Sequence, residues 1–223
     1  MELNECQISK IQTKSGAVTF LDVLGWKGIW AKQHDAINRL HGLVMEMKEV
    51  ADDRTLRISH EIPGARGMTT NVLSISDTIA IFTPGDPRPA IEAHAAICQY
   101  AIPDSIRRRI PLRGATAYGD FSIKENIMVG AAVDESASWH EATDWIGVIL
   151  TPSAIYHLRG DFPDNSAQYL NIPFKGKKYG LDRCIDWNLG QDDDVNRIFL
   201  EMGPHVPEIA LKYLNTLDFL NRR

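Results

Sequence analysis

Apolar residues follow two different spacings along the chain. Short runs rich in β-branched and other apolar residues are typical of buried strands and are too short to cross a membrane. One such run begins at Val18. It leads into a single carboxylate, Asp22, and then into a glycine turn that ends at Trp26. Further strands are predicted at Leu112–Phe121, Trp145–Leu150, Gln168–Phe174 and Tyr179–Trp187.

The other spacing, three to four residues between apolar positions, predicts amphipathic helices. This spacing is found at Asp35–Val50 and Pro207–Leu220. Small residues predict helices at Pro89–Ala101 and Ala131–His140, and two more are expected to begin at Thr151, where a proline follows, and at Gln191. Pro103 is expected to end the helix that begins at Pro89, because proline lacks the backbone donor of a helix interior. The polar segment Ala51–Thr70 is expected to be a connection.

The segment Asn71–Phe82 allows two interpretations. As one continuous strand, it would place Asp77 on the same apolar face as Ile75 and Ile79. As a hairpin, it would use Ser76 and Asp77 as the turn, because both side chains bond readily to local backbone. The hairpin costs less free energy and puts Asp77 at a strand end, as Asp22 is. Alternating strands and helices with a hairpin predict an α/β or α+β fold on one sheet.

Composition narrows the functional classes. The 223 residues fit one large domain or one domain with a helical appendix, and 44% hydrophobic with 24% charged residues is typical of a soluble globular protein. A net charge of -5 argues against a general nucleic-acid surface. The three cysteines lack C-x-x-C spacing, and no secretory signal or apolar run of about 18 residues is found. We expect a cytoplasmic protein with no membrane contact.

Carboxylates at strand ends suggest the chemistry. Asp22 and Asp77 would converge if their strands were neighbours, and hard divalent cations prefer such oxygen ligands. Two cations held there could carry a triphosphate. The alternative is that each aspartate is a structural turn or N-cap residue. The basic run Arg107–Arg109 is either a solvated face or a phosphate site.

Several motifs, in order, resemble class III nucleotidyl cyclases. The run Phe20–Trp26 resembles the first metal-binding strand and turn of that family, and Ser76-Asp77 resembles the second metal aspartate in its hairpin. Gly130–His140 resembles the dimer-interface helix, and Phe174–Lys177 the late loop whose lysine contacts the triphosphate. The matches extend from about residue 17 to residue 187.

The resemblance implies an α+β fold, a ferredoxin-like cyclase palm with a mixed sheet and helices on one face. Residues 1–190 would form the catalytic domain and residues 191–223 a C-terminal helical extension of it. The implied chemistry is attack of a ribose 3′-oxygen on the α-phosphate with two Mn²⁺ or Mg²⁺ ions bound. The implied assembly is a homodimer whose composite sites take the aspartates from one subunit and Lys177 from the other.

Site residues are carried over position by position. Asp22, the carbonyl of Val23 and Asp77 would bind the metals. The substrate phosphates would contact the turn amides of Leu24, Gly25 and Trp26 together with Lys177 and Lys175, although a solvated hairpin tip explains the lysines nearly as well. Phe20, Leu73 and Ile127 would line the base pocket, with Phe20 equally well explained as a core residue. Lys124, Arg113 and Asp134 are the candidates for stabilising the transition state.

The departures from the family concern the base and the transition state. Leu73 and Ile127 stand where purine cyclases have a base-reading lysine and carboxylate, and Asp134 and Ser138 stand where they have Asn and Arg. An apolar pocket would leave the exocyclic groups of a purine unpaired.

The stretches Arg113–Asp120 and Ser136–Gly147 look most like the bacterial anti-phage pyrimidine cyclases known as Pycsar. That resemblance implies synthesis of cyclic UMP or cyclic CMP, which acts on a separate effector protein. Adenylate cyclase activity and a non-catalytic nucleotide-binding module remain alternatives.

Overall fold

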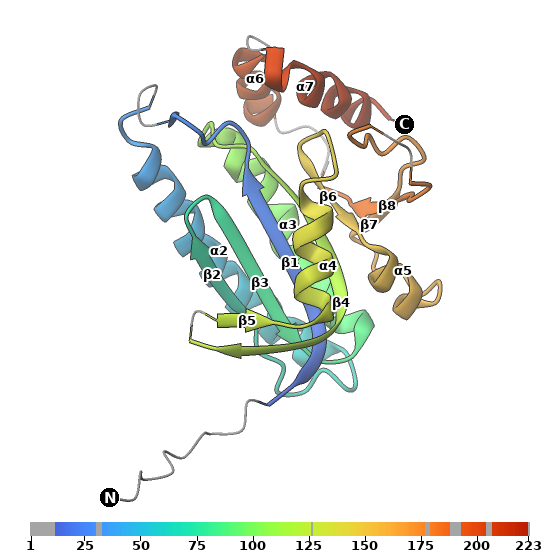
Figure 1. Ribbon diagram of the computed structural model, residues 1–223. Coiled ribbons are helices and arrows are strands. Elements are labelled where there is room, and N and C mark those ends of the chain that lie inside the picture. The colour runs from blue at the N-terminus through green and yellow to red at the C-terminus, as the bar shows by residue number, and fades with distance from the viewer. Residues whose placement is uncertain are drawn as a thin grey trace, which may run out of the picture.

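A computed structural model describes residues 12–29, 33–125, 127–176, 179–187, 193–203 and 207–222 (Figure 1). Its strands form one mixed sheet in the order β2-β3-β1-β4-β6-β8-β7, with β5 paired to the far end of β4. The pairing of β4 with β6 is parallel and the other pairings are antiparallel. The strands are β1 Lys14–Val23, β2 Asn71–Ile75, β3 Thr78–Pro84, β4 Leu112–Lys124, β5 Ile127–Val129, β6 Gly147–Leu150, β7 Ser166–Gln168 and β8 Arg183–Ile185.

Helices cover both faces of this sheet. They are α2 Ala36–Glu61, α3 Pro87–Arg107, α4 Ala131–His140, α5 Pro152–Leu158, α6 Asp193–Met202 and α7 Pro207–Leu220. Figure 1 shows α2 and α3 behind the sheet and α4 in front of it. None of the helices in the described part of the chain is both long and apolar enough to span a bilayer.

Side chains of β1 point alternately to the two faces of the sheet, and this alternation explains why helices pack on both faces. Ala17, Leu21 and Val23 belong to the large core that contains α2 and α3, whereas Val18 and Phe20 belong to a smaller cluster with α4. The sequence therefore specifies an α+β fold with a mixed sheet, as predicted. The expectation that helices lie on one face holds for α2 and α3 but not for α4, whose small residues pack on the opposite face.

Several predicted elements agree with the structure. The hairpin is confirmed: β2 and β3 pair with Ile75 opposite Thr78, and Ser76 in the turn has φ 58°. Helix α4 has the predicted bounds, and α7 covers the predicted tail. The late strands β7 and β8 are much shorter than the runs predicted for them.

Two helices are longer than predicted because tertiary burial continues past the local stop signals. Pro103 lies inside α3, where the next turn carries Ile106, which is fully buried. Burial of that turn outweighs the roughly 3 kcal/mol that an interior proline costs. Helix α2 likewise continues beyond Ala51 to Glu61, because Thr55 and Ile58 extend its buried stripe.

The C-terminal helices share the main core. Phe199 and Tyr213 stack with ring centroids 5.2 Å apart, and Phe219 meets Trp145 edge-on at 4.8 Å. Trp145 and Phe219 are both fully buried. Helix α7 is therefore anchored beside the segment that enters β6.

Candidate active site

Asp22 and Asp77 lie side by side at one edge of the sheet. Asp22 is the penultimate residue of β1 and pairs with Thr78, the residue that follows Asp77. The amide of Val23 donates to the carbonyl of Asp77 at 3.2 Å. The structure thus brings together the three residues that the sequence assigns to metal binding. Asp22 lies within a strand, so the N-cap alternative does not apply to it.

Arg113 is the immediate partner of Asp22. Its Nη2 and Nε lie 3.0 and 3.3 Å from Asp22 Oδ2, and its Nη1 donates to the carbonyls of Thr143 at 3.1 Å and Glu141 at 3.4 Å. Burial raises the pKa of Asp22 above its ordinary value; the charge and hydrogen bond of Arg113 oppose this shift, and Asp77 adds to it. Arg113 therefore holds one oxygen of a carboxylate that burial would otherwise favour in its neutral form.

The glycine turn offers fewer free amides than predicted. Leu24 donates its N–H to the carbonyl of Pro111 at 2.8 Å, so the expectation that this amide contacts phosphate is wrong in this structure. Gly25 has φ +76°, a left-handed conformation that favours glycine. No described residue accepts a hydrogen bond from the amides of Gly25 or Trp26. These two amides remain available to a ligand.

Two of the three base-pocket residues share one face. Phe20 and Leu73 both pair with Ala80, from opposite sides, so their side chains lie in one row across β1, β3 and β2. Phe20 is half-buried and contacts Phe82 edge-on, with ring centroids 6.4 Å apart. Ile127 lies on β5 and is 69% exposed, so a single chain does not bring it into this row.

The candidate transition-state residues are dispersed within one chain. Lys124 lies eleven residues beyond Arg113 on β4, about 36 Å along an extended strand. Asp134 is exposed on α4, where Ser138 Oγ donates to its carbonyl at 2.7 Å. Arg113 alone is at the carboxylates. One chain therefore does not assemble the set.

The late lysine loop lies near Arg113. Lys175 donates its amide to Ala142 at 2.9 Å. Its side-chain pKa is lowered by burial and then by the charges of Arg113 and Lys212. Lys177, the other predicted phosphate ligand, lies outside the described residues.

His140 is a site residue that the sequence did not single out. It is the last residue of α4, its ring centroid lies 6.1 Å from that of Phe20, and its charge lowers the pKa of Asp22. Its Nδ1 lies 2.5 Å from the Ala137 carbonyl. Helical spacing could have found it, because Ser136, four residues earlier, accepts the amide of Phe20 at 2.9 Å.

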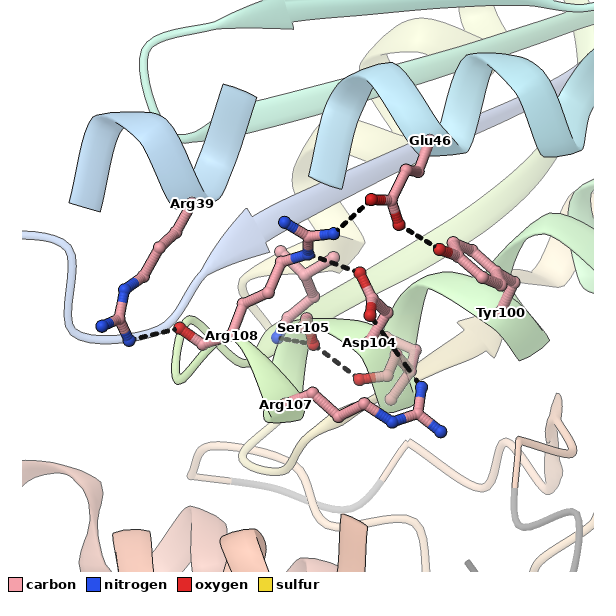
Figure 2. Close-up of polar contacts among 9 residues, drawn as sticks. Arg39, Glu46, Tyr100, Asp104, Ser105, Arg107 and Arg108 are labelled. Carbon is pink, nitrogen blue, oxygen red and sulfur yellow. Dashed lines mark hydrogen bonds and ion pairs between the residues drawn. The ribbon is translucent and has the colours of Figure 1, made fainter. Parts of the chain in front are cut away.

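The basic run at the end of α3 is structural rather than a phosphate site (Figure 2). Arg108 Nε lies 2.5 Å from Asp104 and its Nη2 lies 2.6 Å from Glu46 on α2. Arg107 also pairs with Asp104, at 3.9 Å. Arg109, not drawn in the figure, pairs with Glu201 of α6 at 2.7 Å. The phosphate interpretation of this run is therefore not supported.

The oxygen donors at the sheet edge fit divalent cations that a substrate helps to hold. In the described part of the chain no group of three or more His, Cys, Asp or Glu side chains could by itself hold a metal ion. Asp22 and Asp77 supply two carboxylates, and the backbone of Val23 adjoins them. Hard cations accept such a set when phosphate or water oxygens complete it.

Comparisons with known proteins give structural matches only. No family model matches the sequence, and no curated protein matches it. The catalytic core of a rhodopsin-guanylyl cyclase with converted specificity, solved with ATPαS, matches with a TM-score of 0.52 at 15% identity, over 79% of this chain and 96% of that one. This match shows that the chain has the class III cyclase fold.

Two longer proteins give weaker matches. A bacterial light-regulated adenylyl cyclase has a TM-score of 0.48 at 11% identity, over 86% of this chain and 56% of that one. A class III adenylyl cyclase-like ATP-binding protein from Pseudomonas aeruginosa has a TM-score of 0.47 at 12% identity, over 88% and 44%.

Proposed function

We propose that this protein is a pyrimidine nucleotide cyclase that converts UTP or CTP to the 3′,5′-cyclic monophosphate and pyrophosphate. The observation that carries the proposal is the adjacency of Asp22 and Asp77 at the sheet edge of a class III cyclase fold. Two carboxylates at this position suit divalent cations that carry a triphosphate.

Asp22, the carbonyl of Val23 and Asp77 would hold two Mn²⁺ or Mg²⁺ ions. Bound there, such ions neutralise phosphate charge and lower the barrier to phosphoryl transfer. The chain's own residues orient the triphosphate: the free amides of Gly25 and Trp26 face its oxygens, and the charge of Arg113 lies beside Asp22. In the proposed reaction the ribose 3′-oxygen would bond to the α-phosphorus as the bond to pyrophosphate breaks, and the proton of the 3′-hydroxyl would pass to water.

The pyrimidine preference comes from the apolar row on the α4 face. Leu73 and Phe20 offer a surface on which a base can stack, but no charged group that would pair with the exocyclic groups of a purine. Leu73 and Ile127 stand where the family resemblance gives purine cyclases their charged base readers. The proposal takes UTP or CTP over ATP, the substrate of the alternative adenylate cyclase, because these readers are replaced.

The assembly and biological role follow from the family resemblance. A homodimer would bring Lys177 of one subunit to the aspartates of the other, and Lys124, Ile127 and Asp134 would reach the site only across that interface. The cyclic nucleotide would act on a separate effector protein in anti-phage defence.

A non-catalytic nucleotide-binding module is a second candidate. It is favoured by α4, where Ser138 is bonded to its own helix and position 134 has an acidic side chain, so neither residue supplies a positive charge to a transition state. Nucleotide binding without product at saturating Mn²⁺ would establish it.

Asp22→Asn and Asp77→Asn test the proposed function, with Asp52→Asn, at an exposed position of α2, as the matched control. Pyrophosphate release from UTP and CTP in Mn²⁺ is the readout. Each site variant is expected to lose at least about 100-fold in rate, because metal affinity depends on its carboxylates, while the control keeps wild-type turnover. Full turnover in either site variant would refute the proposal.

A further inference from the structure

Helix α4 runs along β1 toward Asp22 (Figure 1). Near the start of the helix, Ala132 Cβ lies 3.7 Å from the point where a Cβ on Gly119 would stand, and Gly119 is opposite the beginning of β1. One turn later, Ser136 accepts the amide of Phe20 at 2.9 Å. The helix and the strand therefore advance side by side in the same direction.

His140 ends the helix level with Asp22. The four residues from Ser136 to His140 rise about 6 Å along the helix, and the two residues from Phe20 to Asp22 span about 6.6 Å of strand. The residue after His140 confirms this level, because its carbonyl accepts a hydrogen bond from Arg113 at 3.4 Å and Arg113 pairs with Asp22. Contacts within one chain therefore fix the end of α4 beside the carboxylate.

The ring of His140 has one bonded and one unbonded nitrogen. Its Nδ1 lies 2.5 Å from the carbonyl of Ala137, and because a carbonyl can only accept, Nδ1 has the hydrogen. Its Nε2 makes no hydrogen bond to a residue of the described ranges; Glu141 Oε1 lies 3.9 Å away, beyond hydrogen-bond distance. The side chain is only 12% exposed, so this nitrogen gains when a ligand supplies a partner.

A nucleotide bound as proposed would place its ribose next to this nitrogen. Phe20 and Asp22 are two residues apart on β1, so both side chains lie on the face that α4 covers. A base stacked on Phe20 and phosphates at Asp22 leave the ribose between them. The ring of His140 borders this interval, with its centroid 6.1 Å from that of Phe20.

We propose that His140 Nε2 forms a hydrogen bond with the ribose 3′-hydroxyl, the nucleophile of the proposed reaction. A hydroxyl both donates and accepts, so the bond forms with the ring in either protonation state. The contact orients the 3′-oxygen and transfers no proton. This inference deepens the proposed function and rests on it. It uses one chain only, since His140 and Asp22 belong to the same subunit.

The test measures nucleotide binding to the full chain by calorimetry in Mn²⁺. The probes are the α,β-methylene analogues of UTP and CTP with their 2′-deoxy and 3′-deoxy forms, in which the bond that cyclisation breaks is replaced. His140→Phe keeps an aromatic ring beside Phe20 but removes both nitrogens. The matched control is His157→Phe on α5, an exposed histidine whose ring also contacts an aromatic side chain, that of Tyr118, at 4.9 Å.

His140→Phe is expected to bind the parent and 2′-deoxy analogues about tenfold more weakly than wild type, the loss of one hydrogen bond, and the 3′-deoxy analogue equally well. His140→Gln, whose amide can still bond to a hydroxyl, should keep most of the affinity, and the control should bind all analogues as wild type does. His140→Leu has the same expectation as the Phe variant and replaces it if that variant does not fold.

Equal losses for all three forms would overturn the inference, because they would show a structural role for His140. A loss that disappears with the 2′-hydroxyl, or no loss at all, would also overturn it. A wild-type protein that binds none of the analogues would refute both proposals. Binding that depends on His140 and the 3′-hydroxyl, without cyclisation of any nucleotide, would refute the proposed function alone.

Discussion

Replacing His94 with glutamine should remove a large part of the acid sensitivity of the fold. His94 lies on α3 and is fully buried. Its Nδ1 lies 2.7 Å from the hydroxyl of Thr19 and its Nε2 lies 2.9 Å from that of Thr83. Burial lowers the pKa of this imidazole from 6.5 to about 3. The folded protein therefore keeps His94 neutral, bonded to two uncharged hydroxyls.

The sign and size of the effect follow from proton linkage. Below pH 6.5 the unfolded chain binds a proton that the folded chain does not, so the free energy of unfolding falls as pH falls toward 3. The loss is about 1.4 kcal/mol per pH unit, or about 2 kcal/mol between pH 7 and pH 5. Glutamine cannot titrate, yet its amide can still donate and accept hydrogen bonds.

Urea unfolding followed by tryptophan fluorescence at pH 7, 6 and 5 provides the measurement. Wild type should lose about 2 kcal/mol more stability over this range than His94→Gln, because the contributions of all other groups cancel in the difference. His41→Gln, at an exposed position of α2, is the matched control. Parallel losses in wild type and His94→Gln would show that the buried imidazole is not the source of the effect.

Two further predictions concern packing and assembly. Gly114→Ala should lower the free energy of unfolding in urea by about 1–3 kcal/mol, because its new Cβ would stand 2.4 Å from the Phe20 carbonyl oxygen. The control, Gly119→Ala on the same strand, meets only ordinary contacts. Equal stability of the two variants would contradict the close approach of the strands. Asp22→Asn and Lys177→Met are each expected to be inactive alone. When they are mixed, half of the randomly assorted dimers contain one of each chain, and one of the two sites in such a dimer is intact, so about a quarter of wild-type cyclase activity should return. A mixture that stays inactive would argue against composite sites.

The features of the site that depend only on residues adjacent in the sequence, a turn and a strand end, could be predicted from the sequence. The turn at Ser76 and Asp77 follows from side chains that bond their own backbone, and the buried strand before Asp22 follows from its apolar run. Together they placed both carboxylates at strand ends. The pairing of β1 with β3 then brings the two together, as expected for neighbouring strands.

Three features of the site could not be predicted from the sequence, because they depend on contacts between distant segments of the chain. The Leu24 amide is bonded by Pro111, a residue that no local pattern links to the glycine turn. Likewise, the sequence leaves the run Arg107–Arg109 as either a solvated face or a phosphate site, whereas in the structure Glu46, on another helix, pairs with Arg108 (Figure 2). His140 approaches Phe20 only because α4 packs on β1. Tertiary packing determines all three.

The most direct test of the account is a cyclisation assay with ATP, GTP, UTP and CTP in Mn²⁺, with the products identified by mass spectrometry. The account predicts cyclic UMP or cyclic CMP as the dominant product, with pyrophosphate released in equal amount. Dominant cyclic AMP or cyclic GMP would contradict the role assigned to the apolar row of Phe20 and Leu73. Absence of any cyclic product from all four nucleotides would contradict the cyclase function itself.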